Sequence, residues 1–117
     1  QPKARPTRNG VRAPGLRLTG FHAYTGSMCL TPEPIAENIA NLCAIFRKAV
    51  ALAGIVPKTL IFGAGFGIPL HAGQKPLDID ALHALVEPHI RDLANDPVLG
   101  AARRLLEVGR WISGPTG

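Results

Sequence analysis

The sequence predicts a domain of the α/β class in which strands and helices alternate in the order strand, helix, strand, helix, strand. In two long segments, apolar residues recur at spacings of three and four, which is typical of amphipathic helices. Short apolar segments that end at glycines or other small residues lie before, between and after these helices. Because a helix that connects two strands in this way usually leads to a parallel neighbour, we expect one parallel sheet.

The first strand is expected within residues 15–22, where apolar and polar residues alternate and Gly20 permits another segment to approach closely. Thr31 suits the N-cap of the first helix, and Pro32 suits its first position, where the missing N–H costs nothing. Gly54 is placed to end this helix. Its apolar face is expected to comprise Ile35, Ile39, Leu42, Phe46, Val50 and Ala53.

The second strand is expected at residues 59–62, an apolar run typical of a strand that is buried on both faces. It leads into residues 63–67, which we interpret as a glycine turn. Asp78 is a suitable N-cap for the second helix, and Pro88 is expected to bend or break that helix. The last strand is expected at residues 104–107, followed by another glycine turn. The apolar stripe of the second helix is expected to comprise Ile79, Leu82, Val86, Ile90 and Leu93.

Length and composition narrow the class of protein. The 117 residues amount to one small domain, and the hydrophobic share of 46% excludes disorder by composition. No apolar run approaches the roughly 18 residues of a membrane helix, so we expect no membrane partner. Two cysteines are too few for a disulfide scaffold, and the four histidines form no zinc-binding pair. We therefore expect no metal, and a cytoplasmic location.

The net charge of +5 arises from the beginning of the chain. Residues 1–17 contain five basic residues and no acidic one, whereas the remaining 8 basic residues balance the 8 acidic ones. A nucleic-acid surface usually spreads its basic residues over a folded face and interleaves aromatic ones, and no aromatic residue lies in this stretch. We interpret residues 1–14 as a basic loop or linker and expect no nucleic-acid partner, with polyanion binding as the alternative.

Each predicted strand ends where small residues accompany a polar or charged one. Because ligands of parallel α/β folds gather at the carboxyl ends of the strands, these segments are the candidate site. Glycine amides, a serine hydroxyl and a guanidinium favour an anion or a phosphoester. The simpler alternatives are a tight turn, a local ion pair between Glu107 and Arg110, and a packing role for Tyr24. The candidate residues are Tyr24, Ser27, Gly63, Ala64, Gly65, Glu107, Gly109 and Arg110.

Three segments resemble successive motifs of one enzyme family, the pyridoxal-phosphate-dependent decarboxylases of the alanine-racemase-like barrel class, which include diaminopimelate and ornithine decarboxylases. The segments are residues 20–27 (GFHAYTGS), 62–69 (FGAGFGIP) and 106–111 (LEVGRW). The resemblance extends over residues 15–117. It implies a partial (β/α)8 TIM barrel, with this chain supplying late βα units from the C-terminal third of the barrel as a partial cofactor-binding domain.

The resemblance implies pyridoxal 5'-phosphate as the cofactor. Ser27 and the backbone amides of Gly63 to Gly65 would bind its phosphate. Ala64 stands where the family usually has a glycine, which is compatible with binding if its φ is negative. Gly109 belongs to the third motif and is counted with the cofactor-binding residues.

Three further side chains receive roles from the resemblance. Glu107 would pair with the pyridine nitrogen and keep it protonated, so that the ring acts as an electron sink. Arg110 would contact either the phosphate or the substrate carboxylate. Tyr24 lies where many members of the family carry a histidine that stacks on the ring.

The implied activity is removal of the α-carboxylate of an amino acid, with diaminopimelate as the leading substrate. Ornithine, or a carrier-bound or unusual amino acid, is the alternative substrate. A racemase on the same barrel is disfavoured, because alanine racemases place an arginine where this chain has Glu107. A non-catalytic protein that binds pyridoxal phosphate is the alternative of another class.

Two parts of the family's site have no counterpart in this sequence. None of the four lysines stands where the resemblance places the Schiff-base lysine, and neither Cys29 nor Cys43 matches the cysteine segment that reaches the partner's site in a homodimer. Moreover, three parallel strands with two helices leave a sheet edge uncovered, which is unusual. We therefore expect a piece of a larger homodimeric enzyme, with no catalytic residue of its own and no activity when isolated.

Overall fold

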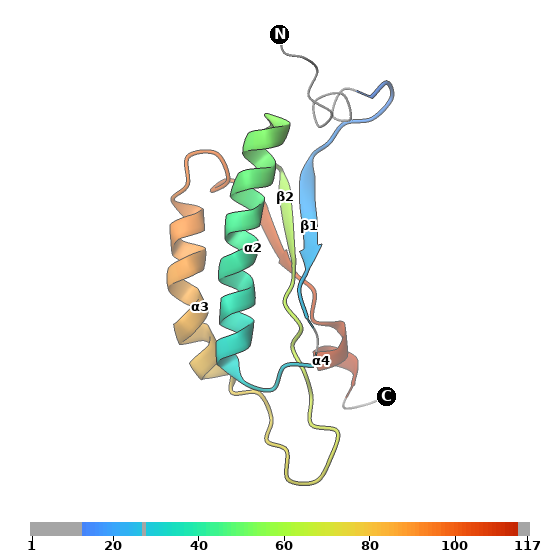
Figure 1. The fold of residues 1–117 in the computed structure, drawn as a ribbon, viewed down its shortest axis with the longest axis vertical. Helices are drawn as coiled ribbons and strands as arrows, with labels where there is room; N and C mark the ends of the chain where they lie inside the picture. Colours follow the sequence, from blue (N-terminus) through green and yellow to red (C-terminus); the bar gives the residue numbers. More distant parts are fainter. Residues whose placement is uncertain (1–12, 27, 115–117) are drawn as a thin grey trace.

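A computed structural model describes residues 13–26 and 28–114 of the chain. The elements confirm the predicted alternation of strands and helices (Figure 1). The short last helix was not predicted, because five residues are too few to show an apolar period. In chain order the elements are β1 (Gly20–Tyr24), α2 (Pro32–Ala53), β2 (Thr59–Gly63), α3 (Ile79–Ala94), β3 (Arg103–Leu106) and α4 (Gly109–Ser113).

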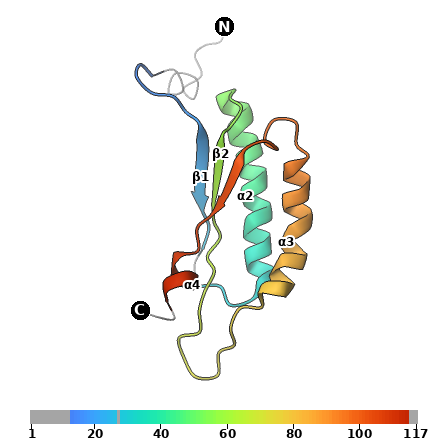
Figure 2. The same cartoon turned by 180° about the vertical axis from the view of Figure 1, so that it is seen from behind.

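The three strands form one parallel sheet in the order β1-β2-β3. Both long helices lie on the same face of this sheet (Figure 2). Leu60 and Phe62 of β2 are buried beneath the helices, whereas Ile61 points to the other face and is only partly buried. All four residues of β3 are exposed. The expectation that β2 is buried on both faces is therefore met on the helix side alone.

Helix α2 begins and ends as its sequence predicts. Pro32 occupies the first position, and Gly54 adopts a left-handed φ of 69° while its N–H donates to the carbonyl oxygen of Val50. The side chain of Thr31 makes no capping hydrogen bond, although its backbone is extended as an N-cap requires. The apolar face of the helix is buried, and the ring of Phe46 meets that of Phe62 edge to face at 5.1 Å.

Helix α3 is capped by Asp78, whose Oδ1 accepts a hydrogen bond from the N–H of Ala81 at 3.0 Å. Pro88 does not break the helix, which continues to Ala94. A proline leaves the carbonyl four residues earlier without its helical partner, and here that residue, Ala84, is exposed to water, which can hydrogen-bond to it. Of the predicted stripe, Leu82 and Leu93 are buried, Val86 and Ile90 pack against the core, and Ile79 is exposed.

The first strand was predicted too early, at residues 15–22. It begins at Gly20 because its partner β2 begins at Thr59, and these two residues are in register. The close approach expected at Gly20 is confirmed, since a β-carbon there would collide with the carbonyl oxygen of Thr59. The interpretation of residues 1–14 as a basic loop concerns a segment of which 1–12 lie outside the described residues.

Beyond the sheet, charged side chains connect the two long helices. Arg47 of α2 lies 3.0 Å from Asp92 and 3.3 Å from Asp96. Asp96 also accepts hydrogen bonds from the N–H groups of Val98 at 2.8 Å and Leu99 at 3.0 Å.

Within the described part of the chain, no helix is both long and apolar enough to cross a bilayer.

The contacts of Asp96 predict an acid-sensitive contribution to stability. The N–H of Leu99, followed by that of Val98, holds the pKa of Asp96 below its ordinary value of 3.8. Because the folded-state pKa is lowered, the contribution is present above pH ~4 and is lost as the pH falls through the folded pKa. We expect Asp96→Asn to flatten the acid limb of a plot of urea midpoint against pH. Glu37→Gln, which removes an exposed carboxylate from α2, is the matched control and should leave that limb unchanged.

Candidate functional site

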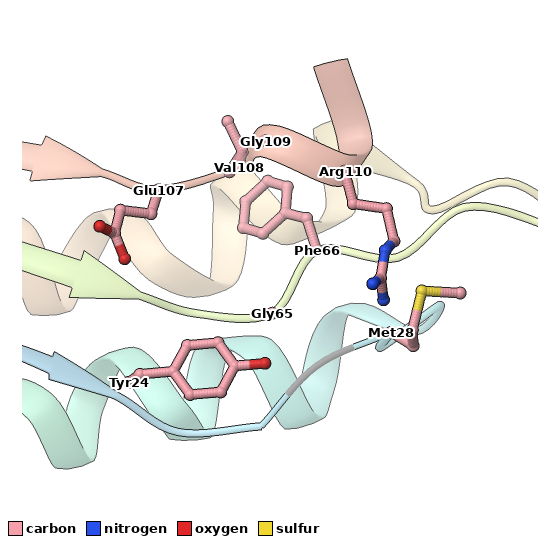
Figure 3. Close-up of a pocket in the computed structure, with 8 residues that line it drawn as sticks. All are labelled: Tyr24, Met28, Gly65, Phe66, Glu107, Val108, Gly109 and Arg110. Carbon is pink, nitrogen blue, oxygen red and sulfur yellow. The ribbon is translucent and has the colours of Figure 1, made fainter. Parts of the chain in front are cut away.

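The carboxyl ends of the three strands meet at one open cavity of about 270 Å³. Figure 3 shows the side chains around it, which come from the ends of β1, β2 and β3 and from the start of α4. Five of the eight lining residues are candidates chosen from the sequence. The lining residues are Tyr24, Met28, Gly65, Phe66, Glu107, Val108, Gly109 and Arg110.

Hydrogen bonds continue the parallel pairing of β1 and β2 beyond the sheet. The N–H of Thr25 donates to the carbonyl of Gly63, and the N–H of Cys29 donates to that of Gly65 at 2.9 Å. The N–H of Gly67 returns a bond of 2.8 Å to the carbonyl of Cys29. Residues 63–67 therefore continue alongside Thr25 and Cys29 without reversing the chain, and their interpretation as a glycine turn was wrong.

The chain instead reverses at the loop that follows. There the N–H of Gln74 donates to the carbonyl of His71, while Oε1 of Gln74 accepts from the backbone N–H groups of Leu70 and His71. The glycine at 67 serves close packing, since a β-carbon there would lie 2.7 Å from the backbone of Met28. Gly67 thus allows this segment to lie close against the backbone of Met28 and Cys29.

The three central candidates of this segment have different surroundings. Gly65 lines the cavity with a φ of +80°, a conformation that favours glycine. Ala64 is fully buried in the core, and its φ is not positive, which meets the condition stated for an alanine at this position. Neither Gly63 nor Ala64 lines the cavity. Ser27 lies outside the described residues.

Gly63 nevertheless affects the shape of the site through Tyr24. These two residues are in register, so their side-chain directions lie on the same face of the sheet. A β-carbon at position 63 would lie 2.8 Å from Cδ1 of Tyr24. The absence of a side chain at Gly63 therefore leaves the room that the Tyr24 ring occupies, and that ring is 59% exposed at the edge of the cavity.

Glu107 continues the line of β3, because its N–H donates to the carbonyl of Phe62 at 2.9 Å. Its carboxylate pairs with His22, whose Nε2 lies 2.7 Å from Oε2. The alternative of a local ion pair with Arg110 is wrong. Arg110 projects from α4 at the other end of the cavity, on the side of Met28 (Figure 3). The cavity thus has a carboxylate at one end and a guanidinium at the other.

Four residues of this region were not selected from the sequence. Met28 has a φ of 57°, the only positive value at a non-glycine residue in the part of the chain that the structure describes, and nothing in its residue type signals this. Phe66 packs edge to face against Trp111 at 6.3 Å, and Val108 completes the wall. His22 could have been found from its alternation with Tyr24 along the first strand.

A cavity at the carboxyl ends of parallel strands, with glycine backbone, a carboxylate and a guanidinium around it, defines the class of α/β cofactor-binding domains. Residues 3–114 match the family described as pyridoxal-dependent decarboxylase, pyridoxal binding domain, and the chain belongs to this family. The resemblance read from the three motifs is confirmed, and the cofactor is pyridoxal phosphate.

Three curated relatives of the chain are named as decarboxylases. The chain is 31% identical over 112 residues to diaminopimelate decarboxylase of Thermoplasma acidophilum and 26% identical over 110 residues to that of Corynebacterium efficiens. It is 28% identical over 96 residues to L-glutamyl-[BtrI acyl-carrier protein] decarboxylase of Niallia circulans. These alignments cover 92%, 93% and 82% of this chain, but only 25%, 24% and 22% of the respective relatives. The chain spans about a quarter of their length.

The residues around the cavity fit this cofactor. A pyridine nitrogen that carries a proton needs a hydrogen-bond acceptor, and Glu107 presents a carboxylate at one end of the cavity. A phosphate needs donors, and Arg110 supplies a guanidinium at the opposite end. A flat ring needs an apolar neighbour, and Tyr24 supplies an exposed aromatic face.

Proposed function

We propose that this chain is part of an amino-acid decarboxylase in which the cavity at the strand ends holds pyridoxal phosphate. The observation that carries the proposal is the convergence of Glu107, Tyr24 and Arg110 on one cavity, although they come from segments more than 80 residues apart in sequence. The complete protein would remove the α-carboxylate of its substrate. Diaminopimelate is our leading substrate, because two of the relatives carry that name.

We further propose that the chain forms late βα units of a (β/α)8 barrel. The uncovered face of the sheet supports this, because it presents His22, Ile61 and Leu105 side by side in register and none of the helices in residues 13–26 and 28–114 packs on it. Inward-facing side chains of neighbouring strands fill the interior of such a barrel. A complete barrel takes roughly 250 residues, which is about twice the length of this chain. The chain also covers only 24% of the diaminopimelate decarboxylase of Corynebacterium efficiens, which supports a part of a barrel. We propose that the complete protein is a homodimer.

When bound, the cofactor supplies a ring that accepts the electron pair left by the departing carboxylate. Glu107 would hold a proton at the pyridine nitrogen, because an ionised carboxylate favours the charged form of a neighbouring base. Arg110 would bind an anionic oxygen of the phosphate or of the substrate carboxylate. Tyr24 would lie against the ring and limit its tilt. The positions of Tyr24 and Glu107 at strand ends, and of Arg110 on α4, support these roles.

Carrier-bound glutamate is the second candidate substrate, and the match to the carrier-protein decarboxylase supports it. A free diamino acid and a substrate tethered to a carrier differ in size and in charge. Competition between the two substrates in one assay therefore separates these candidates.

The test is release of labelled carbon dioxide from diaminopimelate, ornithine and carrier-bound glutamate by the complete protein. We expect turnover of one of these substrates, and absorbance from bound cofactor. The 117-residue chain alone should show no turnover, since the resemblance places the Schiff-base lysine outside it. Turnover by the isolated chain would contradict the proposed partial barrel, and a complete protein that binds the cofactor but releases no carbon dioxide would contradict the proposed activity.

A further inference from the structure

One side-chain contact at the site joins the two outer strands of the sheet. His22 lies on β1 and Glu107 follows β3, yet Nε2 of His22 is 2.7 Å from Oε2 of Glu107. The two side chains meet above β2, on the face opposite to α2 and α3. An ionised carboxylate can only accept, so Nε2 carries the hydrogen in this bond. The contact fixes the direction of a carboxylate whose backbone is already held.

The backbones on both sides are fixed independently of this contact. The N–H of Glu107 donates to the carbonyl of Phe62, and His22 is in register with Ile61. The remaining freedom of Glu107 is rotation of its flexible side chain. The hydrogen bond to His22 removes much of that freedom, because the histidine side chain is short and has few rotamers.

The contact leaves part of the Glu107 carboxylate accessible. In this chain the side chains of His22 and Glu107 are 48% and 52% exposed on the open side of the sheet. Within the described residues, the second carboxylate oxygen, Oε1, has no hydrogen-bond partner. The histidine therefore holds one oxygen while the other stays available to the cavity that Glu107 lines.

We propose that His22 is a positioning residue, which orients the carboxylate of Glu107 toward the pyridine nitrogen of the cofactor. This rests on the proposed function, in which Glu107 is the partner of that nitrogen. An acceptor already held in place loses less freedom on binding than one that must be ordered. His22 thus acts through Glu107 without contacting the cofactor ring.

The test uses the complete protein and ¹⁵N-labelled pyridoxal phosphate. We expect His22→Leu to weaken cofactor binding by a few-fold to about ten-fold, the range for ordering one flexible side chain. The ¹⁵N chemical shift of the pyridine nitrogen should move toward that of the neutral ring. His22→Gln retains an N–H donor and should restore part of both effects. His89→Leu, at an exposed position on α3, is the matched control and should change neither.

The outcomes separate this inference from the proposed function. If Glu107→Gln moves the ¹⁵N shift but His22→Leu leaves both the shift and the cofactor affinity unchanged, the positioning role is overturned while the proposed function stands. If Glu107→Gln does not move the shift, the assignment of Glu107 fails, and the role of His22 fails with it. If His22→Gln behaves like His22→Leu, the donated hydrogen bond is not the cause, and the proposal is overturned. Near-equal unfolding midpoints of the variants would confirm that folding is not responsible.

Discussion

Glu107→Gln in the complete protein is expected to lower kcat for decarboxylation by roughly 10²–10³-fold, the range for removing one preorganised electrostatic group. Glutamine has nearly the same shape, so the hydrogen bond from its backbone to Phe62 and the cavity wall should persist. It carries no negative charge, however, and so favours the neutral pyridine nitrogen. Steady-state kinetics at saturating cofactor measure the effect, and we expect kcat to change far more than KM.

The control for this prediction is Glu37→Gln, which makes the same chemical change at an exposed position on α2. Its rate should equal that of the unmodified protein. A Glu107→Gln protein with unchanged kcat would remove Glu107 from the mechanism. A loss of rate in both variants would point to a general effect of charge.

The second large effect is expected in the core. Phe46 is 1% exposed and meets Phe62 edge to face, so Phe46→Ala should lower the free energy of unfolding by about 3–5 kcal/mol. This value combines the lost burial of the ring with the cavity that it leaves. Urea unfolding followed by circular dichroism measures it. Because domains are stabilised by only about 5–15 kcal/mol, this loss is a large share of the protein's stability.

Leu52→Ala is the matched control for Phe46→Ala. Leu52 lies on the same helix but is 61% exposed, so its truncation should change the free energy of unfolding by no more than about 0.5 kcal/mol. Equal losses from the two variants would contradict the core described for α2. A small loss from Phe46→Ala alone would mean that neighbouring side chains refill the space.

The helices were predictable because their signals are local. The spacing of the apolar residues in α2 indicates a helix, and Gly54 directly after it indicates where the helix ends. The start of β1 was not, because it depends on where Thr59 lies in the partner strand. The glycines of residues 63–67 suggest a turn for the same reason: the signal is local, whereas pairing with Cys29 keeps the segment alongside the end of β1.

The site was predictable to the extent that it follows from strand ends. Tyr24 and Glu107 come to one cavity because the parallel strands β1 and β3 end at the same edge of the sheet. The partner of Glu107 was not predictable from local spacing, because His22 lies 85 residues away and reaches it only through the register of three strands. The conformation of Met28 also depends on tertiary packing, since methionine itself does not favour a positive φ.

The contact between His22 and Glu107 makes the two outer strands depend on each other's alignment. Side chains alternate between the two faces of a strand, so a slip of one residue in either pairing would turn His22 or Glu107 toward the helices. The pair would then be lost, together with the carboxylate at the cavity. Formation of this one bond during folding would therefore report that both strand pairings have reached their native alignment.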